Sequence, residues 1–416
     1  MGDRRHRNTL GDYFTLQRGT TYKSQLLGQP GPILLGLATI QRNGGFRRDS
    51  LQTYGGGSPD KLLVHPGDLY LSLKDVTQSA DLLGAVARLP VDLPPARLTQ
   101  DTVKLEPKHA DVPLDYLYWL LRTPQYRAYC RAHATGTTNL GLAREDFLAF
   151  PAPAPNPVQL QTVKVLGELE DKIELNRRTN ETLEAMARVL FKSWFVEFNP
   201  VRAKAEGRDP GLPPPLADLF PSRVIDSELG PMPFGWRVAA LGELLELAYG
   251  RALKDENRNL GTIRVFGSNG QVGWHNEKLA NGPGIIVGRK GNPGSVTWSP
   301  TDFFAIDTTF YVKPTPRCSS LHFLFFALKE HDLAALSADS AVPGLNRNIA
   351  YMSKQIVPPR ELLRLFDSIV QPLFARMHDA DAESGTLAAL RDTLLPKLIS
   401  GELRITTAER PLESVV

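Results

Sequence analysis

The chain has 416 residues, 42% of them apolar and 8% aromatic, and its formal net charge at pH 7 is +3. This composition excludes general disorder and gives the chain enough length for two substantial globular domains. The near-neutral charge balance also excludes a strongly basic tail. The two cysteines lie far apart, as expected in a reducing compartment, and no stretch resembles a signal peptide or reaches transmembrane length. We therefore expect a soluble, cytoplasmic protein.

The first globular unit is predicted over residues 1–155. An aromatic-rich segment over 114–129 predicts one buried helix. Closely spaced prolines interrupt regular structure at the end of the unit, because proline fixes φ and disfavours a helix in the preceding residue. Apolar runs bounded by glycine-rich breaks predict strands over 33–37, 68–73 and 102–105.

A long central helix is predicted next, over residues 156–206. It is followed by a linker over 207–235, whose prolines and glycines are typical of a semi-rigid, irregular spacer. The second globular unit is predicted over 236–358, and a second long helix over 359–403 precedes a tail over 404–416. In the second unit the patterns predict strands over 263–266, 284–287 and 308–312, and a helix over 321–328.

Short motifs recur in the same order in the two halves of the chain, and the spacing between the members of each pair shrinks almost steadily along the chain. A collinear duplication with shortened loops in the second copy explains this trend. We therefore predict an α/β (α+β) fold with two similar globular domains and an internal pseudo-two-fold repeat. The pairs are Leu10-Gly11-Asp12 with Leu241-Gly242-Glu243, Gly19 with Gly250, Lys74 with Lys290, Asp101-Thr102 with Asp307-Thr308, Phe150-Pro151 with Val357-Pro358, and Thr182-Leu183-Glu184-Ala185 with Thr386-Leu387-Ala388-Ala389.

The two long helices carry a heptad seam, which predicts that they pack together as an antiparallel two-helix coiled coil. A helix over 158–197 would be on the order of 60 Å long. Asn176 and Asn180 lie in the seam, where a polar residue fixes register at some cost in stability. Pro372 predicts a kink or a helix start just before it. The seam consists of Leu166, Leu169, Ile173, Asn176, Asn180, Leu183, Ala187, Leu190 and Trp194, and of Val370, Leu373, Met377, Ala380, Ser384, Leu387, Arg391, Leu394 and Leu398.

Catalytic motifs are missing from the sequence. It contains no phosphate-binding loop of the Walker type, no methyltransferase signature and no HExxH motif, and two cysteines cannot build a zinc site. Pro59-Asp60 with 170–172 superficially resembles a nuclease pattern, but the second part falls on the polar face of the predicted coiled coil. We therefore expect no catalytic residues and no metal site.

Polar and basic loops recur at matching places in the two halves. Arginine, lysine, asparagine, serine and threonine are the residues that read base edges and hold phosphates. An ordinary solvated turn explains any one loop alone, but the repetition favours recognition of two short DNA sequences. The candidate DNA-binding residues are Thr20, Thr21, Tyr22, Lys23, Lys74, Thr137, Thr138, Asn139 and Arg144 in the first unit, and Arg251, Ser268, Asn269, Arg289, Lys290, Asn292, Asn346, Arg347 and Asn348 in the second.

The whole chain resembles the specificity (S) subunit of Type I restriction–modification systems. Asn199 stands where that family often has aspartate. The motifs that carry the resemblance are Asp171-Lys172-Ile173-Glu174-Leu175-Asn176-Arg177, Thr182-Leu183-Glu184-Ala185, Leu190-Phe191-Lys192-Ser193-Trp194-Phe195-Val196, Asn199-Pro200-Val201-Arg202-Ala203-Lys204, Leu229-Gly230-Pro231-Met232-Pro233 with Gly235-Trp236, and Leu390-Arg391-Asp392-Thr393-Leu394-Leu395-Pro396-Lys397-Leu398-Ile399-Ser400-Gly401-Glu402-Leu403.

The resemblance implies two target-recognition domains, each of which binds one half of a split double-stranded DNA site. It also implies two modification (methyltransferase) subunits and restriction (translocase/endonuclease) subunits as partners, which would carry S-adenosylmethionine, ATP and Mg, so that this chain needs no cofactor. The alternative is a free-standing bipartite DNA-binding regulator. A fused methyltransferase or a nuclease would need a further cofactor-binding domain, for which we expect no remaining segment.

Overall fold

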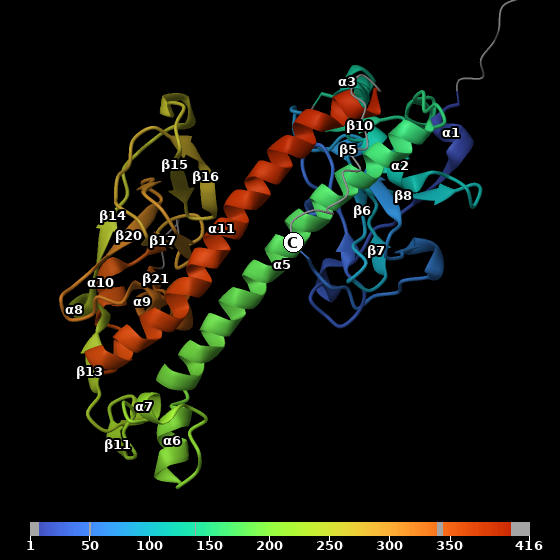
Figure 1. Cartoon of the computed structure of the whole chain (residues 1–416). Helices are drawn as coiled ribbons and strands as arrows, with labels where there is room; N and C mark the ends of the chain where they lie inside the picture. The colour runs from blue at the N-terminus through green and yellow to red at the C-terminus, as the bar shows by residue number, and fades with distance from the viewer. Residues whose placement is uncertain (1–7, 50, 138, 339–343, 401–416) are drawn as a thin grey trace, which may run out of the picture. The chain divides into compact units, whose positions relative to one another are not determined.

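The computed structural model describes residues 8–49, 51–137, 139–338 and 344–400, except for the side chains of Ser337, Ala338 and Leu398. Helices and strands are mixed throughout these ranges (Figure 1). The chain forms two compact units, the first from Met1–Ile173 with Gly385–Val416 and the second from Glu174–Ser384. The first unit therefore combines an early and a late segment of the chain.

The first unit contains a four-stranded antiparallel sheet in the order β1-β8-β4-β6. β1 lies at its edge and mixes buried and exposed side chains, whereas all four residues of the interior strand β4 are buried. Two three-stranded sheets, β5-β10-β9 and β2-β7-β3, complete the unit. The strands are β1 Phe14–Arg18, β2 Leu34–Leu35, β3 Leu63–Val64, β4 Leu69–Ser72, β5 Lys74–Asp75, β6 Val86–Arg88, β7 Ala96–Leu98, β8 Thr102–Pro107, β9 Ala134–Thr135 and β10 Leu140–Leu142.

The segment predicted as one helix over 114–129 forms two helices, α2 (Leu114–Leu120) and α3 (Pro124–Ala132). Thr123 caps α3 by accepting a hydrogen bond from the Tyr126 amide at 3.3 Å. The prediction of a single helix is wrong because proline favours the first position of a helix and cannot continue one. The remaining helices are α1 Leu10–Tyr13, α4 Arg144–Leu148 and the 3₁₀ turns Ser24–Leu26, Leu37–Thr39 and Asp60–Leu62, the second of which replaces the end of the strand predicted over 33–37.

The second unit contains a four-stranded antiparallel sheet in the order β14-β20-β17-β18, which is the same order by position in the chain as in the first unit. A three-stranded sheet, β16-β15-β19, lies in the same unit, and β13 pairs with β23. The strands are β13 Arg237–Ala240, β14 Leu245–Tyr249, β15 Ile263–Gly267, β16 Gly270–His275, β17 Gly284–Gly288, β18 Val296–Ser299, β19 Phe303–Ala305, β20 Thr309–Pro314, β21 Ser337–Ala338, β22 Gly344–Leu345 and β23 Lys354–Val357. The helices are α8 Leu241–Leu244, α9 Leu321–Glu330, α10 Arg347–Met352 and the 3₁₀ turns Asp255–Asn257 and Leu333–Leu336.

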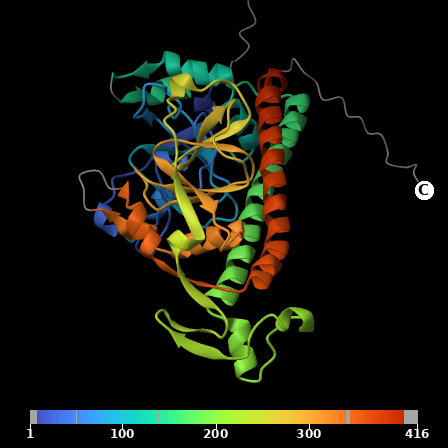
Figure 2. The same ribbon diagram turned by 90° about the vertical axis from the view of Figure 1, so that its left-hand side faces the viewer.

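The segment predicted as an irregular linker over 207–235 is folded. It carries α7 (Pro214–Ala217) and the hairpin of β11 (Val224–Ser227) and β12 (Gly230–Pro233), and it packs with α6 (Asn199–Ala205) beyond the end of the first long helix (Figure 2). Lys204 Nζ donates to the carbonyls of Ala217 at 3.0 Å and Phe220 at 2.6 Å, and the buried Phe220 ring lies 5.1 Å from Trp194. Composition alone missed this module because its order depends on these contacts.

The long helices are α5 (Pro157–Phe195), of 39 residues, and α11 (Arg360–Ile399), of 40 residues. In the first unit the start of α5 meets the end of α11, where Gln159 Nε2 donates to the Ile399 carbonyl at 2.7 Å. In the second unit the later part of α5 meets the earlier part of α11, where Asn176 Nδ2 donates to the Ala380 carbonyl at 3.3 Å. The two helices thus run antiparallel within each unit.

None of the described side chains of the predicted seam is exposed. The helix start predicted just before Pro372 is wrong, because α11 begins at Arg360 and continues through the proline. Pro372 and Ser368 are exposed, so the Ser368 carbonyl, which loses its helical hydrogen bond, can be hydrated. The central helix predicted over 156–206 ends earlier, at Phe195, and Phe198 adopts a left-handed conformation with φ of 56° before α6 begins.

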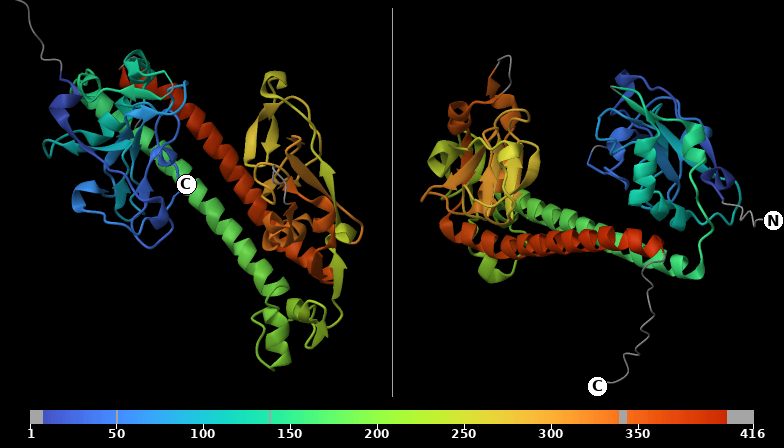
Figure 3. Two further views of the ribbon diagram at one scale, coloured as in Figure 1. Left: turned by 180° about the vertical axis from the view of Figure 1, so that it is seen from behind. Right: turned by 90° about the horizontal axis from the view of Figure 1, so that it is seen from above.

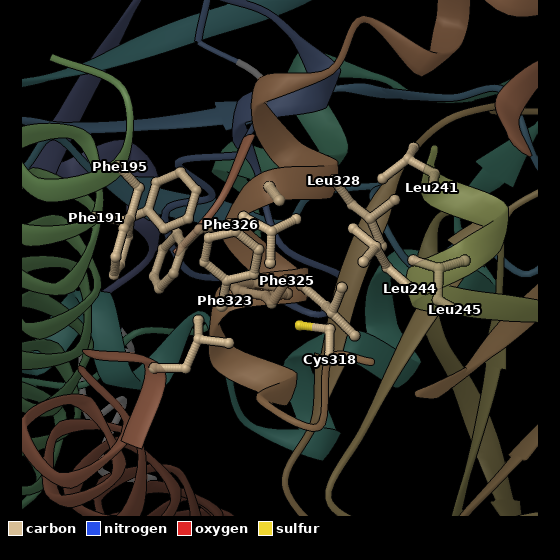
Figure 4. Packing of buried hydrophobic residues seen from close by; sticks show 14 of the residues in the cluster. Phe191, Phe195, Leu241, Leu244, Leu245, Cys318, Phe323, Phe325, Phe326 and Leu328 are labelled. Atoms are coloured by element: carbon tan, nitrogen blue, oxygen red, sulfur yellow. The ribbon is translucent and has the colours of Figure 1, made fainter. Parts of the chain in front are cut away.

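In each unit the strands lie to one side of the long helices (Figure 3). The core of the second unit joins the two layers through aromatic side chains. Phe191 and Phe195 of α5 point toward Phe323 and Phe326 of α9 (Figure 4), with ring centroids 5.2 Å apart for Phe195 and Phe323. On the other side of α9, Leu244 of α8 belongs to the same buried cluster. This packing fixes the sheet whose ends carry the candidate site.

Candidate nucleic-acid interface

Two arginines of the second unit share one exposed aromatic ring. Arg289 directly follows β17, and Arg347 is the first residue of α10. Their Cζ atoms lie 4.9 and 4.8 Å from the ring centroid of Tyr249, the last residue of β14. The Tyr249 ring is 51% exposed and packs against Phe310 at 5.0 Å. The contact thus places two guanidinium groups beside an accessible surface.

Main-chain carbonyls orient both guanidinium groups. Arg289 Nη1 donates to the Asp307 carbonyl at 3.3 Å, and Arg347 Nη1 donates to the Leu247 carbonyl at 3.4 Å. Within the described residues, no carboxylate lies at ion-pair distance from either guanidinium. Two positive charges therefore stand together without a neutralising partner, an arrangement that favours an anion.

Neighbouring loops bring further predicted residues to this place. Ser295 Oγ donates to the Ser268 carbonyl at 2.6 Å, and a Cβ added to Gly291 would lie only 3.2 Å from Ser268 Oγ. Lys290 and Asn292 are exposed on the loop that contains Gly291. Of the predicted residues of the second unit, the structure thus brings together Ser268, Arg289, Lys290, Asn292 and Arg347.

In the first unit, a buried arginine organises the loop predicted at 20–23. Arg97 of β7 donates to Thr20 Oγ1 at 2.9 Å and to the Thr21 carbonyl at 3.2 Å. Its guanidinium lies 4.9 Å from the Tyr54 ring, which in turn contacts the Tyr22 ring at 6.2 Å. The loop therefore has a fixed path. Its four predicted residues are all exposed: Thr20, Thr21, Tyr22 and Lys23.

Lys74 and the hairpin of β9 and β10 lie on one three-stranded sheet. Lys74 Nζ forms an ion pair with Asp101 at 3.0 Å. Gln78 donates to the Thr137 carbonyl in the hairpin loop, where Asn139 is exposed. The structure thus brings Lys74, Thr137 and Asn139 to neighbouring positions, with the lysine already partnered.

Arg144 and Arg347 make corresponding contacts in the two units. Arg144 is the first residue of α4, and its Nη2 donates to the carbonyl of Leu16, the third residue of β1. This bond is 2.7 Å long. Arg347 donates to Leu247, the third residue of β14. Both arginines therefore connect a helix to the edge strand of its sheet as well as lying near the predicted loops.

In the described part of the chain, the other predicted residues form no hydrogen bond with these groups of residues. Asn346 caps α10, because its Oδ1 accepts from the Asn348 amide at 3.0 Å. Arg251 and Asn269 are exposed, and the Arg251 amide is held by the Ala305 carbonyl at 3.0 Å. Thr138 lies outside the described residues.

Sequence reasoning missed two residues that organise these surfaces, Tyr249 and Arg97, and it named Asp75 only as the neighbour of Lys74 in a polar loop. Asp75 is fully buried, and its carboxylate accepts from the Thr77 amide at 2.8 Å and the Leu82 amide at 2.7 Å, which fixes the loop that carries Gln78. Tyr249 directly precedes the repeated Gly250, but its position in the sequence does not indicate that its ring contacts two arginines.

Among the described residues, no group of three or more histidine, cysteine, aspartate or glutamate side chains could hold a metal ion. Within the same ranges, none of the helices is long and apolar enough to cross a membrane.

Comparisons with known proteins identify relatives of the chain. No protein-family profile matches it. It is 27% identical over 317 residues to the Type I restriction enzyme MjaIX specificity subunit of Methanocaldococcus jannaschii, which covers 70% of this chain and 69% of that protein. It is 26% identical over 308 residues to the Type I restriction enzyme HindI specificity subunit of Haemophilus influenzae, with 59% of this chain and 67% of that protein covered.

The fold is similar to the crystal structure of a Type I restriction–modification system S subunit from M. genitalium. The TM-score is 0.53, the sequence identity is 18%, and the match covers 96% of this chain and 98% of that chain. At this identity the likeness concerns the fold alone.

Proposed function

The chain is homologous to the specificity subunits of Type I restriction enzymes, and we propose that it selects the DNA sequence on which a Type I restriction–modification complex acts. The observation that carries this proposal is the similarity over 317 residues to a named specificity subunit. The two basic loop clusters, each beside a sheet of the same strand order, support it further. Each cluster would read one half of a bipartite target in duplex DNA.

We assign the two readers to the target-recognition domains predicted over 1–155 and 236–358. The shared strand order supports an internal pseudo-two-fold repeat, in which each sheet presents its loops to a separate half-site. The unexposed seam of α5 and α11 supports an antiparallel coiled coil that separates the domains. In this arrangement the helices would set the spacing of the two half-sites, and the loops would set their sequences.

The contacts that we propose follow the chemistry of the loops. The exposed amide of Asn139 suits a base edge, since an asparagine can pair with adenine in the major groove. Lys290 and the Thr20 hydroxyl suit phosphate oxygens. Lys74 is paired with Asp101 in this structure, so a DNA contact by Lys74 would compete with that ion pair.

The chain would act through partner subunits. Two modification subunits would supply methyl transfer with S-adenosylmethionine, and restriction subunits would supply ATP- and Mg-dependent translocation and cleavage. Three exposed apolar side chains on α5 support partner docking, since α11 does not cover them: Leu175, Met186 and Val189.

Co-expression with a modification subunit tests the proposal. The pair should methylate adenine at one bipartite sequence, read by sequencing methylated genomic DNA, whereas the purified chain alone should neither methylate nor cut. Methyl transfer by the lone, verified-pure chain would contradict the proposal. Tight sequence-specific binding by the lone chain, without methylation in any co-expression, would instead favour the free-standing regulator.

A further inference from the structure

We propose that Tyr249 is a positioning residue, whose ring holds Arg289 and Arg347 together as a site for one backbone phosphate of duplex DNA. The proposal rests on the proposed function and deepens it. In this proposal Arg289 and Arg347 anchor the DNA independently of its sequence. Tyr249 contributes indirectly, because it positions the two arginines.

The geometry of the three residues carries the proposal. Both Cζ atoms lie within 5 Å of one ring centroid, at 4.9 and 4.8 Å, so the ring is shared by two cations. Like charges in such proximity repel each other, and the electron-rich face of an aromatic ring offsets part of that repulsion. The Tyr249 ring packs against the Phe310 ring, with the two ring centroids 5.0 Å apart. Tyr249 thus preorganises a pair of positive charges on two half-buried arginines beside its own exposed side chain.

The missing counter-charge indicates a phosphate rather than a base edge. No carboxylate among the described residues lies at ion-pair distance from either guanidinium, and Arg347 Nε is buried without a hydrogen-bond partner in the same part of the chain. A phosphate group neutralises charge and offers two oxygens to two guanidinium groups, which makes charge-assisted hydrogen bonds. A guanine edge can accept from one arginine, but it is neutral and does not compensate two neighbouring positive charges.

The described residues of the first unit lack this arrangement. Its edge strand β1 ends in Arg18, where the corresponding strand β14 ends in Tyr249. Its lysine at the matching loop, Lys74, is already neutralised by Asp101 at 3.0 Å. The paired site is therefore a property of the second unit, and single variants there should weaken anchoring without touching the first.

Binding of the full-length chain to a fluorescein-labelled duplex of mixed sequence tests the proposal by anisotropy, in KCl from about 50 to 200 mM. Arg289→Ala and Arg347→Ala should each reduce the slope of log affinity against log salt by about one. Tyr249→Ala should weaken binding by about fivefold, whereas Tyr249→Phe should match the wild type because the ring remains. In the Arg289→Ala/Arg347→Ala background, Tyr249→Ala should have no further effect on affinity.

Phe234→Ala is the matched control. Its ring is 49% exposed and lies 3.8 Å from the Arg223 guanidinium, but it belongs to the module beyond α5. This variant should leave the affinity and the salt slope unchanged. Thermal unfolding of each variant separates a loss of binding from a loss of fold. If Tyr249 had a purely structural role, Tyr249→Ala would lower the stability both in the wild-type chain and in the Arg289→Ala/Arg347→Ala chain, and it would leave the salt slope unchanged.

Three results would overturn the inference. The first is no binding of duplex DNA by the wild-type chain, and the second is wild-type affinity and salt slope for Tyr249→Ala. The third is a changed methylation sequence for either arginine variant, which would mean that the arginine reads a base. Failure of the proposed function looks different, because the wild-type chain would then confer no sequence-specific methylation on a modification subunit, whatever the variants do in the binding assay.

Discussion

Arg122 Nη1 lies 2.6 Å from Glu170 Oε1 and so joins the end of α2 to the long helix α5 within the first unit. The Arg122 side chain is only 6% exposed. Tyr118 donates to the same carboxylate at 3.0 Å, and Arg391 of α11 lies 3.6 Å from it. One glutamate therefore connects α2 to both long helices.

Glu170→Gln should lower the free energy of unfolding by about 1–3 kcal/mol, because the buried guanidinium loses its ionised partner. Urea unfolding measures this change. Glu168→Gln is the control, since Glu168 is an exposed residue on the same helix, and its effect should stay within about 0.5 kcal/mol. Equal effects of the two substitutions would contradict a structural role for the Arg122–Glu170 contact.

Glu184 predicts a pH dependence in the second unit. Burial raises the pKa of Glu184, but the cations of Lys329 and Arg188 outweigh burial and hold the pKa below its ordinary value. The resulting stabilisation is present above the pKa of the unfolded chain, about 4.3, and is lost as the pH falls through the lower folded pKa. Glu184→Gln should therefore be less stable than the wild type at neutral pH and converge with it in acid.

Urea titrations over this pH range measure that convergence. Lys329→Met supplies the control, because Lys329 Nζ lies 2.6 Å from Glu184 and is its main partner. In the Lys329→Met background the effect of Glu184→Gln at neutral pH should be smaller. A gap between wild type and Glu184→Gln that stays constant into acid would disprove the assignment.

Gly19 and Gly250 should be equally intolerant of a side chain. A Cβ at Gly19 would lie 2.0 Å from the Thr99 carbonyl oxygen, and one at Gly250 would lie 2.1 Å from the Ile306 carbonyl oxygen. Alanine at either position should destabilise the protein by about 1–3 kcal/mol. Gly167 lies in α5 with open space around it, so alanine there should stabilise by about 0.5–1 kcal/mol. Thermal unfolding compares all three, and a tolerated alanine at only one of the paired glycines would contradict their equivalence.

Exchange of one recognition domain should change one half of the target. Replacement of residues 9–150 by those of another specificity subunit should alter one half-site and leave the other intact. The methylated sequences of the genome give the result directly. A change in both half-sites would mean that the two units do not read independently.

The long helices should set the spacer of the target. Insertion of one heptad into each of α5 and α11 at facing positions lengthens the pair by roughly 10 Å, which is about three base pairs of DNA. We expect a longer unspecified spacer and unchanged half-sites in the methylated sequence. Retained activity with an unchanged spacer would exclude the helices as the ruler.

Periodicity in the sequence predicted the elements that depend on local patterns. The strand predicted over 263–266 is β15, the helix predicted over 321–328 is α9, and the apolar seam found α5 and α11, although α5 ends at Phe195 and not at residue 206. These predictions are confirmed because each depends on apolar residues that the structure buries or half-buries, such as the run over 323–328 in α9 and the described apolar residues of the seam in α5 and α11.

Features that depend on contacts distant in sequence could not be predicted. The module beyond α5 is folded by Lys204 and Phe220, although its composition is that of a spacer. The same reason limits prediction of the site. Residue type alone identified the basic loop residues, whereas Arg97 and Tyr249 act through partners that are distant in the sequence. An arginine in a strand or a tyrosine at its end carries no signal of such a role.

The first unit is built from two segments that are distant in the sequence, and this has a consequence for the order of folding. Leu395 and Ile399 of α11 lie in the same buried cluster as Leu10 and Phe14, so the earliest and latest described segments share one core. Domains generally fold as they leave the ribosome, beginning with the N-terminal one. Here the first unit cannot complete its core during synthesis until all of the second unit, Glu174–Ser384, has been made. The second unit draws its long-helix segments from between those ends, so it can close first, although it is made later.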